Sequence, residues 1–136
     1  MKVYQELLEQ AFKATRLSYA PYSRFRVGAA LLTEDGAVVT GCNVENASYG
    51  LSNCAERTAV FKAVSIGKRR FKAIAVVSNR RNPVYPCGAC RQVLREFNKD
   101  ITIVVANRRG RVMKTSLSKL LPKSFGPEDL GRRRRG

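Results

Sequence analysis

Apolar side chains recur along this chain at two different periods, and the changes of period separate helices from strands. In residues 3–19 they recur at three- and four-residue steps, which predicts a helix with one face toward a core. The proline-containing segment 20–22 is expected to end this helix. Residues 27–33 and 37–40 are short, mostly apolar runs separated by an Asp-Gly pair, and they predict a β-hairpin.

The second half of the chain alternates helices with strands. Residues 55–65 carry apolar side chains at helical spacing and predict a helix, with Asn53 as the expected N-cap. Residues 73–77 are apolar throughout, as in a strand covered on both faces. Residues 43–52 are expected to form a loop. Later expected elements are a helix at 88–97, strands at 101–105 and 111–113, and a short helix at 116–121. Together these elements predict a mixed five-stranded sheet flanked by helices on both sides.

Three cysteines stand where two of these helices are expected to begin. Cys54 precedes one helix, and Cys87 and Cys90 form a Cys-x-x-Cys pair at the start of the next. Three thiolates on a tetrahedral zinc ion leave one position open for water, as in catalytic sites. A redox-active pair is the alternative interpretation of Cys-x-x-Cys. It does not account for the Cys-Ala-Glu sequence that begins at Cys54.

The order of these motifs resembles the zinc-dependent cytidine deaminases. Residues 54–56 read Cys-Ala-Glu and residues 86–90 read Pro-Cys-Gly-Ala-Cys, the all-cysteine form that is most similar to the small homotetrameric enzymes. The resemblance extends from residue 20 to residue 122, with further matches at 25–29 and 41–46. It implies a three-layer α/β/α fold in one domain over residues 1–130, one Zn²⁺ per subunit, and a homotetramer with shared active sites.

The resemblance also implies roles for the residues beside the ligands. Glu56 is the implied proton shuttle, which takes a proton from water, passes it to N3 of cytosine and then protonates the departing amine. An isolated glutamate in a first helical turn would be explained by the helix dipole alone. Arg57 is expected to donate a hydrogen bond to the thiolates, because their negative charge opposes deprotonation of water unless positive charge offsets it. Cys42 matches no ligand position, and we expect it to be a buried free thiol.

Five further residues match the positions that hold the nucleoside in that family: Phe25, Asn43, Glu45, Ala55 and Phe125. Asn43 and Glu45 are implied to bind the ribose 3′-hydroxyl. Phe25 is implied to pack on the sugar or base, and Ala55 to bind the pyrimidine through its backbone. Phe125 is implied to stack in the pocket of a neighbouring subunit. Taken singly, these residues have simpler explanations in core packing or turn formation.

Length and composition agree with one domain in the cytoplasm. A chain of 136 residues, 44% of them hydrophobic, suffices for one core and is too short for two. No apolar run approaches the ~20 residues of a membrane span, and the amino terminus lacks the pattern of a signal segment. We therefore expect a cytoplasmic protein without a membrane segment.

The net charge of +16, from 26 basic and 10 acidic side chains, is not explained by the resemblance. The basic residues are clustered, which favours contact with nucleic acid, although a solvated surface is the simpler explanation. Four arginines lie at 132–135, within the segment 131–136, which we expect to be a disordered basic tail.

The expected function is hydrolytic deamination of free cytidine and 2′-deoxycytidine in pyrimidine salvage. The alternatives are deamination of a modified cytosine nucleoside, as in blasticidin-type enzymes, deamination of single-stranded nucleic acid, and a non-catalytic zinc-stabilised nucleic-acid binder. A 3′-hydroxyl held by Asn43 and Glu45 leaves little room for a continuing phosphodiester. A purely structural zinc site has no need of Glu56.

Overall fold

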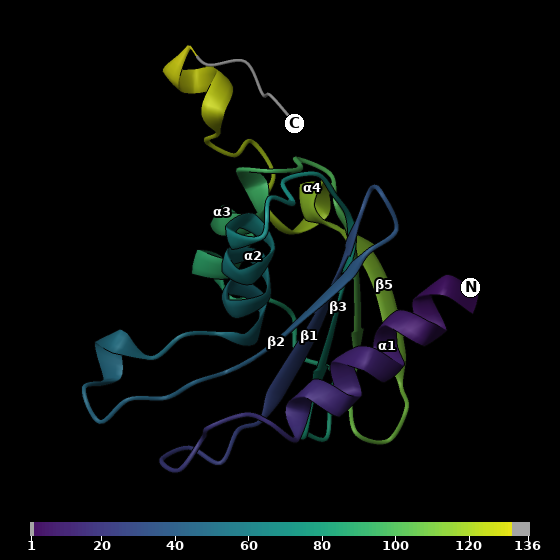
Figure 1. The fold of residues 1–136 in the computed structure, drawn as a ribbon, viewed down its shortest axis with the longest axis vertical. Helices are drawn as coiled ribbons and strands as arrows, with labels where there is room; N and C mark the ends of the chain where they lie inside the picture. The colour runs from purple at the N-terminus through teal and green to yellow at the C-terminus, as the bar shows by residue number, and fades with distance from the viewer. Residues whose placement is uncertain (1, 132–136) are drawn as a thin grey trace.

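The computed structural model describes residues 2–131, so the expected tail at 131–136 lies outside the described residues except for its first residue. One sheet with strand order β2-β1-β3-β4-β5 runs through the protein (Figure 1). β3 and β4 are parallel and the other neighbouring pairs are antiparallel. The elements are α1 (Lys2–Thr15), β1 (Val27–Thr33), β2 (Val38–Cys42), a 3₁₀ turn η1 (Tyr49–Leu51), α2 (Ala55–Ser65), β3 (Phe71–Ser78), α3 (Gly88–Arg95), β4 (Thr102–Ala106), β5 (Val112–Ser116), α4 (Leu117–Leu120) and a 3₁₀ turn η2 (Pro127–Leu130).

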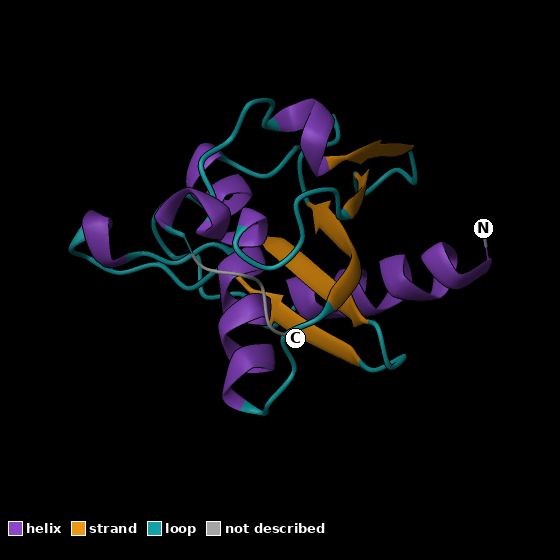
Figure 2. Ribbon diagram, turned by 90° about the horizontal axis from the view of Figure 1, so that it is seen from above, coloured by secondary structure: helices purple, strands orange, loops and turns teal. Residues whose placement is uncertain are grey.

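Helices cover both faces of this sheet, with α1 on one side and α2 and α3 on the other (Figure 2). Alternate residues of β3 supply the two cores, because successive side chains of a strand point to opposite faces. Ile74 and Val76 belong to the cluster under α2 and α3, whereas Ala73, Ala75 and Val77 belong to the cluster under α1. The uninterrupted apolar run of this strand is therefore explained by burial on both faces, and the predicted mixed α/β fold is confirmed.

The approach of α2 to the sheet places the first cysteine motif. Gly41 of β2 lies against α2, and a Cβ atom at this position would lie 2.5 Å from the backbone nitrogen of Ala59 and 2.6 Å from the carbonyl oxygen of Ala55. Only a residue without a side chain permits that contact. The start of α2 is thus held beside the end of β2.

Three details of the fold differ from the sequence-based expectation. α1 ends at Thr15 rather than near 19, and the hydroxyl groups of Thr15 and Ser18 donate to the carbonyl oxygens of Phe12 and Thr15 at 2.5 and 2.6 Å. Such side-chain bonds to a nearby backbone compete with helix continuation. The N-cap of α2 is Cys54 and not Asn53. The 43–52 segment contains η1 and projects from the body of the protein (Figure 1).

None of the helices between residues 2 and 131 combines the length and the apolar character needed to span a membrane.

Candidate metal centre and substrate pocket

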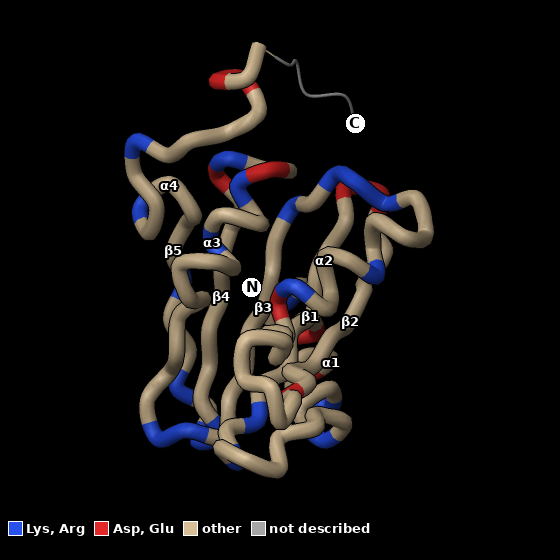
Figure 3. The backbone as a smooth tube through the Cα atoms, turned by 90° about the vertical axis from the view of Figure 1, so that its left-hand side faces the viewer, with Lys and Arg blue, Asp and Glu red and all other residues tan. Residues whose placement is uncertain are grey.

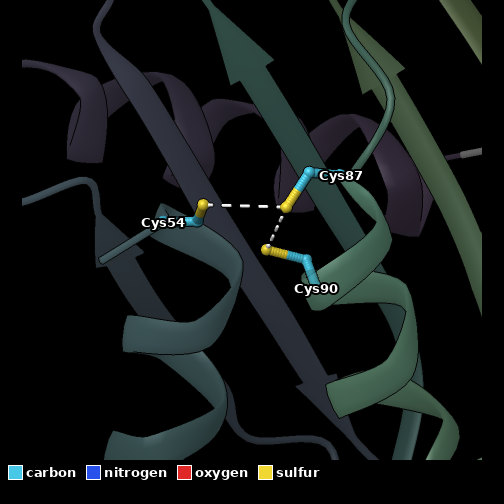
Figure 4. Close-up of side chains that lie close together, drawn as sticks. All are labelled: Cys54, Cys87 and Cys90. Carbon is cyan, nitrogen blue, oxygen red and sulfur yellow. Dashed lines mark hydrogen bonds between the residues drawn. The ribbon is translucent and has the colours of Figure 1, made fainter. Parts of the chain in front are cut away.

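Three sulfur atoms meet at the starts of α2 and α3 (Figure 4). Cys54 and Cys87 are the N-caps of the two helices, and Cys90 lies in the first turn of α3. The Sγ atom of Cys87 lies 3.9 Å from that of Cys54 and 3.5 Å from that of Cys90, and all three lie within 4.8 Å of one another. Tetrahedral zinc with Zn–S bonds of about 2.3 Å requires sulfurs about 3.8 Å apart. The three cysteines are therefore positioned to bind one zinc ion.

The sulfur atoms of this cluster are too far apart to be joined by a disulfide bond. A disulfide bond is about 2.05 Å long, much shorter than the observed separations, and all four cysteines are free thiols. Cys42 is half-buried at the end of β2, rather than fully buried as expected, and burial raises the pKa of its thiol. It is not part of the sulfur cluster.

Arg57 supplies positive charge directly to this cluster. Its Nη2 atom donates to Cys54 Sγ at 3.1 Å, and neither N-cap cysteine accepts a capping hydrogen bond from its own helix. The neighbouring Cys90 thiol and then the Arg57 guanidinium lower the pKa of Cys54 to about 5, although burial opposes this. The pKa of Cys90 is raised, first by its contact with Cys54 and then by burial. The Nε atom of Arg57 is buried without a hydrogen-bond partner among the described residues, so its guanidinium can serve a further thiolate.

Arg91 directly follows Cys90 in the sequence, but it has a different role from Arg57. Its Nε atom donates to the carbonyl oxygen of Pro86 at 2.7 Å, and its Nη1 atom donates to the carbonyl oxygen of Leu120 at 2.9 Å. These bonds tie the loop before α3 to the end of α4. Of the two arginines that follow zinc-site residues, only Arg57 contacts sulfur among residues 2–131.

Glu56 is buried beside the three thiols, with 5% of its surface exposed. Burial raises the pKa of its carboxyl group to about 7, and the nearby Cys54 adds to the effect. A carboxyl group with a pKa near neutrality can both accept and donate a proton under physiological conditions. The position of Glu56 one residue into α2 therefore combines proximity to the metal ligands with the protonation behaviour of a general acid and base.

A pocket of about 230 Å³ opens over this cluster. Its walls include the predicted residues Phe25, Asn43, Glu45, Ala55 and Glu56, together with Cys54 and Cys87. The segment before α3 adds Val84 and Tyr85, which sequence reasoning missed although they directly precede the Pro-Cys motif. The predicted metal and substrate residues, apart from Phe125, are thus brought to one place.

The side chain of Asn43 holds the segment that carries Phe25. Its Oδ1 atom accepts from the backbone nitrogen of Val27 at 2.9 Å, and its Nδ2 atom donates to the carbonyl oxygen of Phe25 at 2.6 Å. One Nδ2 hydrogen and one Oδ1 lone pair remain for a ligand. On the ring of Phe25 lies the guanidinium of Arg80, 4.6 Å from the ring centroid, a contact that the sequence did not predict.

Glu45 is held in a similar way by the turn before Phe25. Its Oε1 atom accepts from the backbone nitrogens of Tyr22 and Ser23 at 3.0 and 3.2 Å, and its Oε2 atom accepts from the Ser23 hydroxyl. The Ser23 hydroxyl is the main cause of the lowered pKa of this carboxyl group. Glu45 therefore faces the pocket as a carboxylate whose orientation is fixed by backbone donors.

Phe125 lies apart from the pocket of its own chain, with 58% of its surface exposed. Its carbonyl oxygen accepts from Gln92 Nε2 at 2.9 Å. Residues on either side of Phe125 are bound by the buried guanidinium of Arg95, which donates to Ser124 Oγ at 2.6 Å and forms an ion pair with Glu128. The C-terminal segment is thus bound to α3 while the aromatic ring stays outside.

Comparisons with known proteins support a zinc-binding deaminase. The model of the cytidine and deoxycytidylate deaminase zinc-binding region matches residues 1–106. The chain is 53% identical to a cytidine deaminase of Sporosarcina psychrophila over 127 residues, which cover 93% of each chain. It is similar to the crystal structure of cytidine deaminase from Burkholderia pseudomallei, with a TM-score of 0.87 and 54% identity over 90% of this chain and 98% of that one. It is 27% identical to a blasticidin-S deaminase of Bacillus cereus over 88% of this chain and 90% of that protein. These matches confirm the resemblance inferred from the motifs, and the chain belongs to the zinc-dependent cytidine and deoxycytidylate deaminase family.

Proposed function

We propose that this protein hydrolyses cytidine and 2′-deoxycytidine to uridine and 2′-deoxyuridine with release of ammonia. The observation that carries the proposal is the buried carboxyl group of Glu56 beside three converging thiols at one pocket. The high identity to cytidine deaminases, against 27% to a blasticidin-S deaminase, favours an undecorated nucleoside.

The reaction adds water to C4 of cytosine and removes the amino group. Zinc bound by Cys54, Cys87 and Cys90 would act as a Lewis acid that lowers the pKa of water. Glu56 accepts one proton from the attacking water and delivers it to N3 of the ring. It then takes the remaining proton of the new C4 hydroxyl group, as the carbonyl forms, and delivers it to the departing amine, which leaves as ammonia. Water and cytidine are consumed, uridine and ammonia are formed, and the carboxyl group returns to its starting state.

The side of the pocket formed by Asn43 and Glu45, here called the loop side, binds the nucleoside. Asn43 and Glu45 have hydrogen-bonding capacity left after their backbone contacts, and both line the pocket, where they hold the ribose 3′-hydroxyl. Phe25 packs on the sugar or base, and the backbone of Ala55 binds the pyrimidine. A substrate without the 3′-hydroxyl would leave the Glu45 carboxylate without this partner, so it should be rejected.

The exposure of Phe125 supports a shared active site. The ring does not line the pocket of its own chain, while the surrounding segment is fixed to α3 by Gln92 and Arg95. We propose that it stacks on the base in a neighbouring subunit of a homotetramer. Size-exclusion chromatography with activity assays across a dilution series should show activity only in the assembled fraction. An active monomeric fraction would contradict the shared site.

The proposed setting is pyrimidine salvage in the cytoplasm. A reducing compartment keeps the thiols of the cluster free for metal, which supports this location. The products are nucleosides, and these are the substrates on which salvage reactions act.

An ultraviolet absorbance assay tests the proposed reaction. Cytidine, deoxycytidine, cytidine monophosphate and a short single-stranded oligonucleotide are compared side by side, with and without prior removal of metal by a chelator. The two free nucleosides should be deaminated, and the activity should disappear with the metal and return when zinc is added. Activity on the oligonucleotide alone, or full activity after metal removal, would overturn the proposal.

A further inference from the structure

Seven exposed arginines lie at one end of the sheet, on three segments that are distant in sequence. These residues, here called the arginine end, are Arg24 and Arg26 before β1, Arg80 and Arg81 after β3, and Arg108, Arg109 and Arg111 between β4 and β5. The strand pairing places the segments together, because the start of β1 pairs with the end of β3, and the parallel β3 and β4 end side by side. Figure 3 shows the β4–β5 turn in blue at this end of the molecule.

Two asparagines fix the backbone of these segments. The side chain of Asn79 donates to the carbonyl oxygen of Arg24 at 2.9 Å and accepts from the backbone nitrogen of Arg26 at 3.1 Å. In this way the segment after β3 is bound to the segment before β1.

Asn107 binds the segment between β4 and β5 to the segment after β3. Its Oδ1 atom accepts from the backbone nitrogens of Arg109 and Arg111 at 3.0 and 2.9 Å, and its Nδ2 atom donates to the carbonyl oxygen of Arg81. The three segments therefore form one rigid surface, and all seven arginine residues on it are exposed.

No acidic side chain among residues 2–131 forms an ion pair with this surface. The ion pairs found among residues 2–131 are Lys68–Asp35 and Arg95–Glu128, and neither involves the arginine end. Of these seven guanidinium groups, only two make a hydrogen bond or a cation–π contact within the described part of the chain: Arg26 donates to the Ser18 carbonyl oxygen at 3.2 Å, and Arg80 lies on Phe25. At the opposite end of the sheet, basic and acidic residues lie together (Figure 3).

We infer that the arginine end binds the phosphate backbone of a single nucleic-acid strand. Guanidinium groups are planar and bind phosphate oxygens through paired hydrogen bonds, and a rigid set of them loses little freedom on binding. Phe25, the aromatic residue between Arg24 and Arg26, lines the pocket beneath Arg80 and is not free to stack on a base. The affinity should therefore come from phosphate contacts and be independent of base sequence. This binding does not depend on the proposed deamination.

Two variants with equal charge loss test the inference. The first replaces Arg81, Arg108, Arg109 and Arg111 with Gln. The control replaces Arg69, Arg70, Lys99 and Lys119 with Gln, four exposed residues at the opposite end of the sheet. Each variant loses four positive charges and falls from +16 to +12, and each retains the arginines at 132–135. Cytidine turnover, which involves none of these eight side chains, reports whether each variant is folded.

The measurement is the fluorescence anisotropy of a labelled 20-nucleotide DNA strand of mixed sequence, titrated at 50–200 mM salt. Single strands show a slope of log K against log salt of about −0.7 per phosphate contact, so seven contacts predict about −5 for the unchanged protein. For the first variant this slope should fall to about −2, and the affinity at 50 mM salt should be lower by about tenfold or more. For the control the slope should stay near −5. Equal losses in both variants would show that net charge alone is responsible and would overturn the inference. Absence of binding by the unchanged protein at 50 mM salt would also overturn it.

Discussion

The two sides of the pocket are positioned by different means. On the helix side, Cys54, Glu56 and the thiols of α3 are placed by the starts of two helices, and the polar side chains contact one another and Arg57. On the loop side, Asn43 and Glu45 are placed by hydrogen bonds from their own side chains to the backbone of residues 22–27.

Because of this difference, the helix-side groups serve mainly the reaction, whereas the loop-side groups serve both the reaction and the fold. The helix-side groups keep bonding capacity for metal and proton, because secondary structure and the apolar core already hold them in place. The loop-side groups use part of their capacity to hold the loops. Substitutions on the helix side should therefore change the reaction with little effect on stability, and substitutions on the loop side should change both. Three variants test this distinction, and a fourth tests the contribution that we propose for a neighbouring subunit.

Glu56→Gln should have the largest effect. It removes the group that moves the proton, so kcat should fall about 10³-fold while zinc content and melting temperature stay close to those of the unchanged protein. Turnover by ultraviolet absorbance and zinc by plasma mass spectrometry give the two readouts. A kcat within tenfold of the original would eliminate the proposed proton shuttle.

Arg57→Gln should come second, with zinc affinity lowered about 10- to 100-fold through loss of the hydrogen bond to Cys54. Competition with a fluorescent zinc chelator measures the affinity. The matched control is Arg91→Gln, because Arg91 also lies near the start of a helix capped by one of these cysteines but, among residues 2–131, donates only to carbonyl oxygens. The control should lower the melting temperature and leave zinc affinity nearly unchanged. If both variants lose zinc equally, the contact between Arg57 and sulfur has no special role.

Glu45→Gln should raise KM about tenfold and lower the melting temperature, with zinc content preserved. The reason is that the same carboxylate accepts bonds from Tyr22 and Ser23 and faces the nucleoside pocket. Steady-state kinetics and thermal denaturation are measured on one preparation. A change in KM without a change in stability would show that the loop side is as independent of folding as the helix side.

Phe125→Ala should have the smallest effect, a rise in KM of about three- to tenfold from loss of stacking across a subunit boundary. Phe12→Ala is the control, since Phe12 is similarly exposed but lies on α1, on the other face of the sheet. The control should leave KM unchanged. An unchanged KM in the Phe125 variant would leave this residue with no role in the site.

The same distinction explains what the sequence could predict. The eight elements expected after the first helix begin within two residues of their predicted positions, because apolar periodicity is a local property. The helix-side site was predicted for the same reason, since Cys54 and Glu56 are separated by one residue and Cys87 and Cys90 by one helical turn. The wrong N-cap arose because Asn53 donates to Thr58 instead, at 3.1 Å.

The loop side depends on contacts between distant segments, which leave little trace in the sequence. The stacking of Arg80 on Phe25 requires the end of β3 to lie beside the start of β1. The backbone bonds of Asn43 and Glu45 likewise join segments about 20 residues apart, so the sequence showed their match to the family but not their part in the fold.

X-ray absorption spectroscopy at the zinc edge tests the central claim most directly. A protein loaded with one zinc ion per chain should show three sulfur neighbours at about 2.3 Å and one oxygen or nitrogen neighbour at about 2.0 Å. That result is predicted by three converging thiols with a position left open for water. Four sulfur neighbours, or a protein that retains no zinc, would contradict it.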